Sequence, residues 1–499
     1  MANNSQSIGE VLKLIPPAER TPAQVAQWRG GRVSNTYQLL QKPANLQELT
    51  KYGLPLAIWR DNNTIVYIYP DSSKDHNLCS DRVFLKLTDY GDNPHLDIFG
   101  ETNTAIAETG AFILGFMDQK HKHSLHIGCC NRLFDFRATG HDCLKRLVET
   151  DAPRNIVFHN LTLIAEQSVV LSTQPHPTKL SFWACKFEDG GTAFVNGLRN
   201  RKTSFGSLHF LEPTALDDNN LKRLFQVPWL ERLEIPRLDD KIALLPFSAQ
   251  ADHLEYDISS ASLLKANLSS LGIVPPKLSL SIHFANEKFP TNFAHAFWRH
   301  LAALGHFVEL KLSLNGIVGS DLPSFVVEEI VRAVMANSRL EVLDLSKHHN
   351  DCVWNQHVEK FFEGIKAHKA LRTLRIAVNY GDDDEAFGPT SSYLRQLLSC
   401  NRNLTVTDGN EHVYTDGDFI DELYSLNRFY RGAADLVAYS QSDRILLVTI
   451  ALLVHSSNNV QRSALLLSNH IDVLSELVLF AQLDEADGSL LQLSYDDAK

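Results

Sequence analysis

Histidine and cysteine side chains are concentrated in one stretch of the sequence, where they could bind a metal ion. They are His121, His123, His126, Cys129, Cys130, His141 and Cys143. Imidazole nitrogens and thiolates are the preferred ligands of zinc. The stretch lacks the paired Cys-x-x-Cys spacing of structural zinc sites, and His126 faces away from the core if Leu125 and Ile127 face it from a strand. We therefore expect an ordinary segment with surface histidines, and neither a metal nor another cofactor.

Four consecutive acidic residues, Asp382, Asp383, Asp384 and Glu385, carry the carboxylates that calcium prefers. They lack the Asp-x-Asp-x-Asp-Gly spacing of a calcium-binding loop. A solvated linker between a strand and a helix is the favoured interpretation.

A second group of reactive side chains, His348, His349, Asp351 and Cys352, contains the Cys/His combination that nucleophilic catalysis uses. It follows directly after the strand expected at Leu343, where adjacent histidines in a turn are usually solvated. The sequence also lacks the Gly-x-x-x-x-Gly-Lys-(Ser/Thr), Gly-x-Gly-x-x-Gly, His-Glu-x-x-His and Gly-x-Ser-x-Gly motifs. We therefore expect no enzymatic activity.

Composition and charge indicate a globular chain that does not bind nucleic acid. Of 499 residues, 44% are hydrophobic and 21% are charged, which is enough apolar material for a packed core. The formal net charge of -12 and the lack of a basic run argue against a phosphate-binding surface.

The sequence favours an intracellular location, cytoplasmic or nuclear, and no membrane partner. The first ten residues contain no charged region followed by an apolar stretch, as a secretory signal would. The longest apolar run, from Ile445 to Val454, is shorter than the roughly 20 residues of a membrane span. Seven cysteines, an odd number, indicate reduced thiols rather than a disulfide framework.

The elements that position these side chains follow from a repeat. A leucine followed two residues later by another apolar residue recurs about every 28 residues. These pairs begin at Leu180, Leu208, Leu233, Leu254, Leu278, Leu310, Leu343, Leu374 and Leu404. Upstream, Ile156-x-Phe158, Leu125-x-Ile127 and Leu96-x-Ile98 continue a similar spacing. Each pair predicts a strand whose inward side chains stack on those of its neighbours.

Between the later strands, the apolar period changes from two residues to about 3.6, which predicts a returning helix. One stripe of this kind is formed by Val358, Phe361, Phe362 and Ile365, and another by Phe293, Phe297, Leu301 and Leu304.

The longer context of the leucine pairs resembles the leucine-rich-repeat family. One repeat fills the consensus of that family, reading Phe307-x-x-Leu310-x-Leu312-x-x-Asn315-x-Ile317. Another follows the cysteine variant, reading Leu180-x-Phe182-x-x-Cys185-x-Phe187. Repeats of this length with a full helix are similar to the ribonuclease-inhibitor-like class. The resemblance implies an α/β fold, a right-handed leucine-rich-repeat solenoid shaped as a horseshoe, with parallel strands on its concave face.

We expect five segments along the chain. Residues 1–50 form a helical or partly flexible leader, residues 51–150 a β-rich N-terminal cap or irregular early repeats, and residues 151–410 the repeat array. Residues 411–483 predict an α-helical C-terminal cap, because Phe419, Leu423, Leu426 and Phe429 share one helical face. Residues 484–499 are polar and are expected to be disordered.

The alternation also predicts which side chains the repeats offer to a partner. Residues that flank the inward leucines point to the opposite face of each strand, which is the concave face of the horseshoe. This set carries both signs of charge and a tryptophan, a composition that suits a protein ligand. The residues expected to bind the partner are Trp183, His209, Arg232, Glu234, Glu255, Asp257, Lys311, Asp344 and Arg375.

Three functions are compatible with the sequence. A protein–protein interaction scaffold that binds a protein partner on the concave face is favoured. A substrate receptor of a ubiquitin ligase is the alternative, in which Ile8–Ile15 and Val25–Trp28 supply short helices of an F-box-like module. A metal-dependent hydrolase centred on the histidine and cysteine cluster is a minor alternative.

Overall fold

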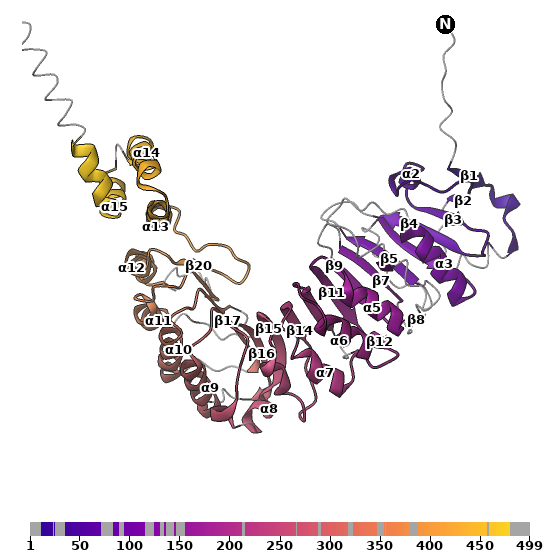
Figure 1. The fold of residues 1–499 in the computed structure, drawn as a ribbon, viewed down its shortest axis with the longest axis horizontal. Coiled ribbons are helices and arrows are strands. Elements are labelled where there is room, and N and C mark those ends of the chain that lie inside the picture. The colour runs from indigo at the N-terminus through magenta and orange to yellow at the C-terminus, as the bar shows by residue number, and fades with distance from the viewer. Residues whose placement is uncertain are drawn as a thin grey trace, which may run out of the picture. The chain divides into compact units, whose positions relative to one another are not determined.

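The computed structural model describes residues 11–22, 24, 35–70, 83–88, 94–114, 124–129, 134–135, 144–145, 155–211, 215–265, 267–287, 291–317, 323–346, 354, 356–378, 387–456 and 459–479. The chain divides into two compact units, Met1–His283 and Phe284–Lys499, each of which is described by itself. In both units parallel strands alternate with helices along the chain, and the helices lie to one side of the strands (Figure 1). The expected α/β class is confirmed.

The N-terminal unit begins with mostly antiparallel strands. In chain order they are β1 (Leu12–Ile15), β2 (Asn35–Leu39), β3 (Leu56–Trp59), β4 (Ile65–Pro70), β5 (Val83–Thr88) and β6 (Pro94–Phe99). β2 pairs antiparallel with β1 and parallel with β3, and β3, β4, β6 and β5 then follow one another antiparallel. The helix α3 (Asn103–Leu114) follows β6 and buries Ile106 and Ile113.

Two expectations from the sequence are wrong in this region. Leu96-x-Ile98 lies in β6, which is antiparallel to its neighbours and is therefore not a further parallel repeat. Apolar alternation marks a half-buried strand of either direction, so this pair does not reveal the direction. Leu12–Ile15 forms a strand, where the F-box-like module would need a helix, because its backbone pairs with β2. The second helix of that module, Val25–Trp28, lies outside the described residues.

Parallel strands make up the rest of this unit. They are β7 (Ser124–Cys129), β9 (Asn155–His159), β11 (Thr178–Trp183), β13 (Gly206–Leu211), β14 (Leu230–Ile235), β15 (His253–Ser259) and β16 (Lys277–Glu287). Each pairs in parallel with the next. The leucines that begin the repeats lie directly opposite one another, and all are fully buried: Leu180, Leu208, Leu233, Leu254 and Leu278. The strand prediction is confirmed here, and Leu125 and Ile156 extend the same row upstream.

The connecting helices are short, as the spacing between the strands requires. They are α5 (Ala165–Thr173), α6 (Thr192–Arg199), α7 (Asp218–Leu224) and α8 (Ser260–Lys265). A second, small parallel sheet forms where the chain leaves the strands, from β8 (Phe134–Asp135), β10 (Leu161–Leu163) and β12 (Lys186–Phe187).

Stacked aromatic rings fill the core behind β11. Phe182 lies between Phe158 on β9 and Phe210 on β13, with ring centroids 5.6 Å away on each side. Phe187 and Phe194 meet the Phe182 ring edge-on. All five rings are 2% exposed or less, so the Phe182 ring is packed among four other buried aromatic rings.

A bulge shifts the register between β13 and β14, opposite the glycine that begins β13. Gly206 begins β13 with a φ of 93°, and a Cβ atom there would lie 2.5 Å from the Thr178 carbonyl oxygen. Gly206 is opposite Leu230 while Ser207 is opposite Arg232, so Glu231 is the extra residue of a bulge. The bulge brings Arg232 and the residues after it into line with the repeats on either side.

The C-terminal unit repeats the same alternation. Its strands are β17 (Glu309–Ile317), β18 (Val342–Leu345), β19 (Thr373–Ile376) and β20 (Thr405–Thr407). Its first helices are α9 (Thr291–Leu304), α10 (Ser324–Ala336), α11 (Val358–Ile365) and α12 (Ser392–Cys400). The stripe of Val358, Phe361, Phe362 and Ile365 is buried on α11, as the helical spacing predicts. Of the predicted stripe on α9, Phe293, Phe297 and Leu301 are buried and Leu304 is half-buried.

The last strand differs in register from the expectation. Leu310, Leu343 and Leu374 lie opposite one another, but Leu374 then lies opposite Val406 rather than Leu404. The displacement is two residues, so Thr405 lies opposite Thr373, where Asn403 was expected, and the two faces of the strand are unchanged.

Three helices follow β20 in the described part of the chain, α13 (Phe419–Asp435), α14 (Gln441–Ala451) and α15 (Val460–Ser468). The face of α13 that is buried differs from the predicted one by one residue: Ile420, Tyr424 and Asn427 are buried, whereas Phe419 is 53% exposed. The Tyr424 hydroxyl accepts a hydrogen bond from the Val406 backbone N–H on β20 at 3.2 Å, which fixes this face against the last strand. On its other side, Phe429 packs on a separate small core that includes Val448 and Leu466.

Among the described residues, no helix combines the length and the apolar character that crossing a membrane requires.

Candidate binding face

The face of the N-terminal sheet opposite the buried leucines carries three rows of side chains, and we call it the polar face. In the first two rows the positions on neighbouring strands lie directly opposite one another, and the third row lies two residues further along each strand. The first row is Asn155, Lys179, Ser207, Arg232, His253 and Lys277, and the second is Val157, Ser181, His209, Glu234, Glu255 and Ser279. The third is His159, Trp183, Leu211, Pro236, which directly follows β14, and Asp257. The first row is therefore basic, and the second is acidic on β14 and β15.

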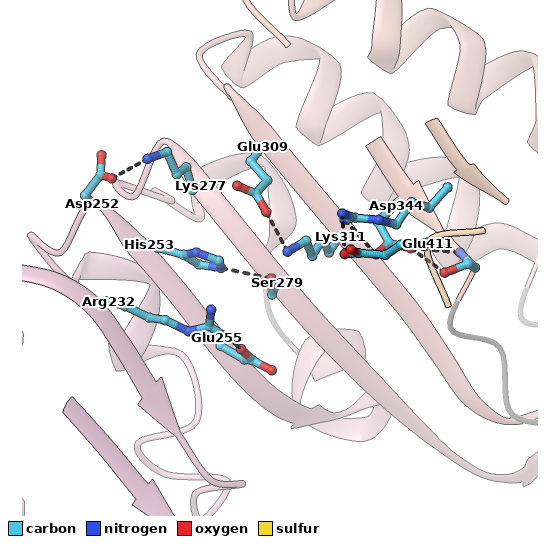
Figure 2. Close-up of polar contacts among 12 residues, drawn as sticks. Arg232, Asp252, His253, Glu255, Lys277, Ser279, Glu309, Lys311, Asp344 and Glu411 are labelled. Carbon is cyan, nitrogen blue, oxygen red and sulfur yellow. Dashed lines mark hydrogen bonds and ion pairs between the residues drawn. The ribbon is translucent and has the colours of Figure 1, made fainter. Parts of the chain in front are cut away.

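Contacts between adjacent strands hold these charges in place (Figure 2). Arg232 on β14 forms an ion pair with Glu255 on β15. Lys277 Nζ lies 2.6 Å from Asp252 Oδ2, and His253 Nε2 lies 2.9 Å from the Ser279 hydroxyl oxygen. These contacts within the chain orient the side chains before a ligand binds.

Glu234, in the middle of the second row, is held in its ionised form. His209 Nδ1 lies 2.9 Å from Glu234 Oε2, and the His209 side chain is buried. The hydrogen bond from His209 is the main cause that lowers the pKa of Glu234, and the nearby positive charges of Arg232 and Lys179 add to it. Glu234 therefore presents a negative charge at neutral pH.

A hollow of about 390 Å³ opens at the carboxyl ends of β11, β13, β14 and β15. It is lined by Trp183, Phe210, Leu211, Glu234, Ile235, Pro236, Arg237, Glu255, Tyr256 and Asp257. Trp183 is 52% exposed there, although an indole of its size is usually more covered. Three carboxylates and one guanidinium line the hollow, so its walls combine an exposed aromatic ring with net negative charge.

Two imidazoles lie beyond Trp183: His159 in the third row, and His126, which is opposite Val157 of the second row. The ring centroids of Trp183 and His159 are 5.0 Å apart, and His159 Nε2 lies 3.3 Å from His126 Nδ1. Burial lowers the pKa of His159 to about 4, with a smaller contribution from His126. The side chain that supports Trp183 is therefore uncharged at neutral pH.

This imidazole pair gives stability a specific pH dependence. An ordinary histidine has a pKa near 6.5, so between about pH 6.5 and pH 4 the unfolded chain binds a proton at His159 that the folded chain does not. The contribution of the neutral, buried His159 to the free energy of unfolding is therefore fully present above about pH 6.5, and it is lost as the pH falls toward about 4. We expect the melting temperature of a His159→Gln variant to fall less than that of the unmodified chain when the pH is lowered from about 7 to about 4.5.

The matched control for this measurement is His412→Gln, whose side chain is 79% exposed. It should follow the unmodified chain over the same pH range. An identical pH dependence for the His159 variant and the unmodified chain would show that His159 titrates normally.

Most members of the histidine and cysteine cluster cannot be placed. His126 lies beside His159, and Cys129 is a buried free thiol. His121, His123, Cys130, His141 and Cys143 lie outside the described residues, as do the acidic run 382–385 and the group at 348–352. Within the described part of the chain, no group of three or more potential ligands could hold a metal ion.

Three of the expected binding residues lie in the C-terminal unit, where each forms an ion pair. Lys311, Asp344 and Arg375 are opposite one another on β17, β18 and β19. Asp344 is buried and lies 3.6 Å from Arg375, which also lies 2.8 Å from Glu411 (Figure 2). Lys311 Nζ lies 2.6 Å from Glu309. These side chains share a face, as predicted, but their charges are neutralised by ion pairs with neighbouring side chains.

The structure brings four of the nine expected residues together around the hollow: Trp183, Glu234, Glu255 and Asp257. His209 and Arg232 lie directly behind them as partners of Glu234 and Glu255. The expected set omitted His159, Leu211, Pro236 and Arg237. The first three continue the alternation that identified Trp183, whereas Arg237 lies beyond the end of its strand, where alternation gives no guidance.

No model of a known protein family matches the chain, and no curated protein sequence matches it significantly. Its function is therefore inferred from the geometry of the polar face.

Proposed function

We propose that this chain is a leucine-rich-repeat protein of the ribonuclease-inhibitor-like class, with the horseshoe shape of that class, and that it binds a protein partner on the polar face without catalysing a reaction. The observation that carries this proposal is the hollow beside Trp183, where a half-exposed indole adjoins three carboxylates. Tryptophan is among the residues most enriched in the energetic centres of protein interfaces.

The charges of the polar face support binding rather than catalysis. Glu234 and Glu255 are engaged by His209 and Arg232, so they act as fixed charges rather than as free bases for proton transfer. Carboxylates around the hollow would repel nucleic-acid phosphates. A protein surface offers both the apolar groups that cover an indole and the cations that match carboxylates.

Photo-crosslinking from the full-length chain tests the proposal. A photo-reactive phenylalanine analogue would replace Trp183, and in a second protein it would replace Lys222, which is exposed on α7. We expect a defined protein from the source cells to crosslink at position 183 and not at position 222. Adding Asp257→Lys, which reverses a negative charge that lines the hollow, should lower the yield at position 183 more than tenfold.

Equal crosslinking from the two positions would contradict the proposal, because it would place the partner elsewhere or show unspecific capture. A yield at position 183 that is unchanged by Asp257→Lys would also contradict it.

A further inference from the structure

We propose that the hollow binds an extended segment of the partner that crosses the strands, with a bulky apolar side chain on Trp183 and a lysine or arginine at Glu255 and Asp257. This inference rests on the proposed function and specifies the chemistry of the ligand. The third row of the polar face gives the segment its direction, because it is apolar at β11 and acidic at β15.

The apolar end consists of Trp183 on β11, Leu211 on β13 and Pro236 directly after β14. One side of the Trp183 ring rests on His159, which is uncharged at neutral pH and so does not compete with the ligand for the carboxylates. Trp183 remains 52% exposed in spite of that contact. A flat or branched apolar side chain that covered the ring would remove this surface from water, which stabilises the complex.

The acidic end consists of Glu255 and Asp257, which point from the same face of β15. Glu255 is paired with Arg232, but the Asp257 side chain is 50% exposed, and His283 Nε2 lies 3.8 Å from its carboxylate. Arg237 is the only cation among the residues that line the hollow, against three carboxylates. An incoming ammonium or guanidinium group would restore the balance of charge, whereas an acidic side chain would worsen it.

The register sets the spacing of the two anchors in the ligand. Trp183 lies opposite Leu211, and Leu211, Pro236 and Asp257 each follow by two positions the paired residues His209, Glu234 and Glu255, so Trp183 and Asp257 are three strand spacings apart. Neighbouring strands are about 4.8 Å apart, so the two positions are separated by about 14 Å. An extended chain advances roughly 3.3–3.6 Å per residue, so it covers this distance in about four residues. The segment therefore carries its basic residue four positions from its apolar residue, with three residues between them.

Fluorescence anisotropy with designed peptides and the full-length chain tests this inference. Each fluorescein-labelled peptide contains one phenylalanine and one arginine, separated by zero to six glycine and serine residues. We expect the tightest binding with three intervening residues, and at least a tenfold weaker affinity when glutamate replaces the arginine. Binding should weaken as salt is raised, because a charge pair is formed.

Variants of the chain locate the two anchors. Trp183→Ala and Asp257→Asn should each weaken the best peptide about tenfold, while Trp183→Phe and Asp257→Glu should retain most of the affinity. The matched controls are Tyr439→Ala, an aromatic residue that is 55% exposed, and Glu359→Gln on α11. Both should bind like the unmodified chain.

The inference fails if affinity is independent of spacing, if the glutamate peptide binds as well as the arginine peptide, or if Asp257→Asn has no effect. If any of these results were obtained together with specific crosslinking at position 183, the proposed ligand chemistry would be wrong, but the proposed function would still be supported. If neither the peptide preference nor the specific crosslink were observed, the proposed function and the proposed ligand chemistry would both be wrong.

Discussion

Replacing Phe182 by alanine should lower the free energy of unfolding of the N-terminal unit by about 3–5 kcal/mol, the range for a buried phenylalanine. The ring is 1% exposed and stacks between Phe158 and Phe210. Phe187 and Phe194 cover its edges, so the space left by truncation is bounded by rigid rings that cannot easily move in to fill it. Because the chain has two units, the loss should be measured locally, as faster amide hydrogen exchange in β9, β11 and β13.

The next residue along the same strand provides the control. Trp183 follows Phe182 on β11 but points to the polar face, where it is 52% exposed. Trp183→Ala removes a larger side chain, yet it should cost less than about 1 kcal/mol because little packing is lost. Equal losses for the two variants would show that the assignment of the two faces of β11 is wrong.

Ending the chain after Gly417 should abolish cooperative unfolding of the C-terminal unit and cause aggregation. The truncation removes α13, which covers the last repeat with Ile420, Tyr424 and Asn427. Val406 and Leu398, both fully buried in the whole chain, would then face water. A strand edge exposed together with apolar side chains is a template for association between chains. Circular dichroism during heating and light scattering would measure the two effects.

A longer truncation separates the role of α13 from that of the helices after it. A chain that ends after Tyr439 keeps α13 and should unfold cooperatively, at a lower temperature than the whole chain. If the chain that ends at Gly417 stayed soluble with the midpoint of the whole chain, α13 would not stabilise the last repeat.

A point variant tests the same contact in the full-length chain. The Asn427 side-chain N–H donates to the Leu398 carbonyl oxygen at 2.9 Å, near the end of α12, where helical carbonyls have no partner within the helix. Asn427→Ala would leave this buried carbonyl unpaired and should cost about 1–3 kcal/mol.

The strands of the repeats could be predicted from the sequence because one physical requirement fixes them. A leucine that is fully buried in one repeat needs another beside it in the next, as Leu233 lies between Leu208 and Leu254. Helices such as α11 were predictable for the same reason, since Val358 and Ile365 recur at helical spacing on its buried side.

Features that depend on packing between distant segments could not be read from spacing. The sequence predicts burial of Phe419 on α13, but the helix is rotated by one residue so that Tyr424 can reach the backbone of β20. The direction of β6 depends on its pairing with β4 and β5, which Leu96 and Ile98 do not specify. Trp183, Glu234, Glu255 and Asp257 could be predicted singly, but their convergence around the hollow depends on the register and on the bulge at Glu231.

The displaced register of β20 shows how this architecture tolerates insertions and deletions. Because side chains alternate along a strand, gaining or losing two residues keeps every inward position inward, as Val406 shows by taking the place opposite Leu374. A change of one residue would instead move every inward side chain to the outer face. A bulge prevents this by leaving one residue unpaired, as Glu231 is in β14. Lineages that carry this fold should therefore accumulate length changes in steps of two within strands, and changes of odd length only in loops or at bulges.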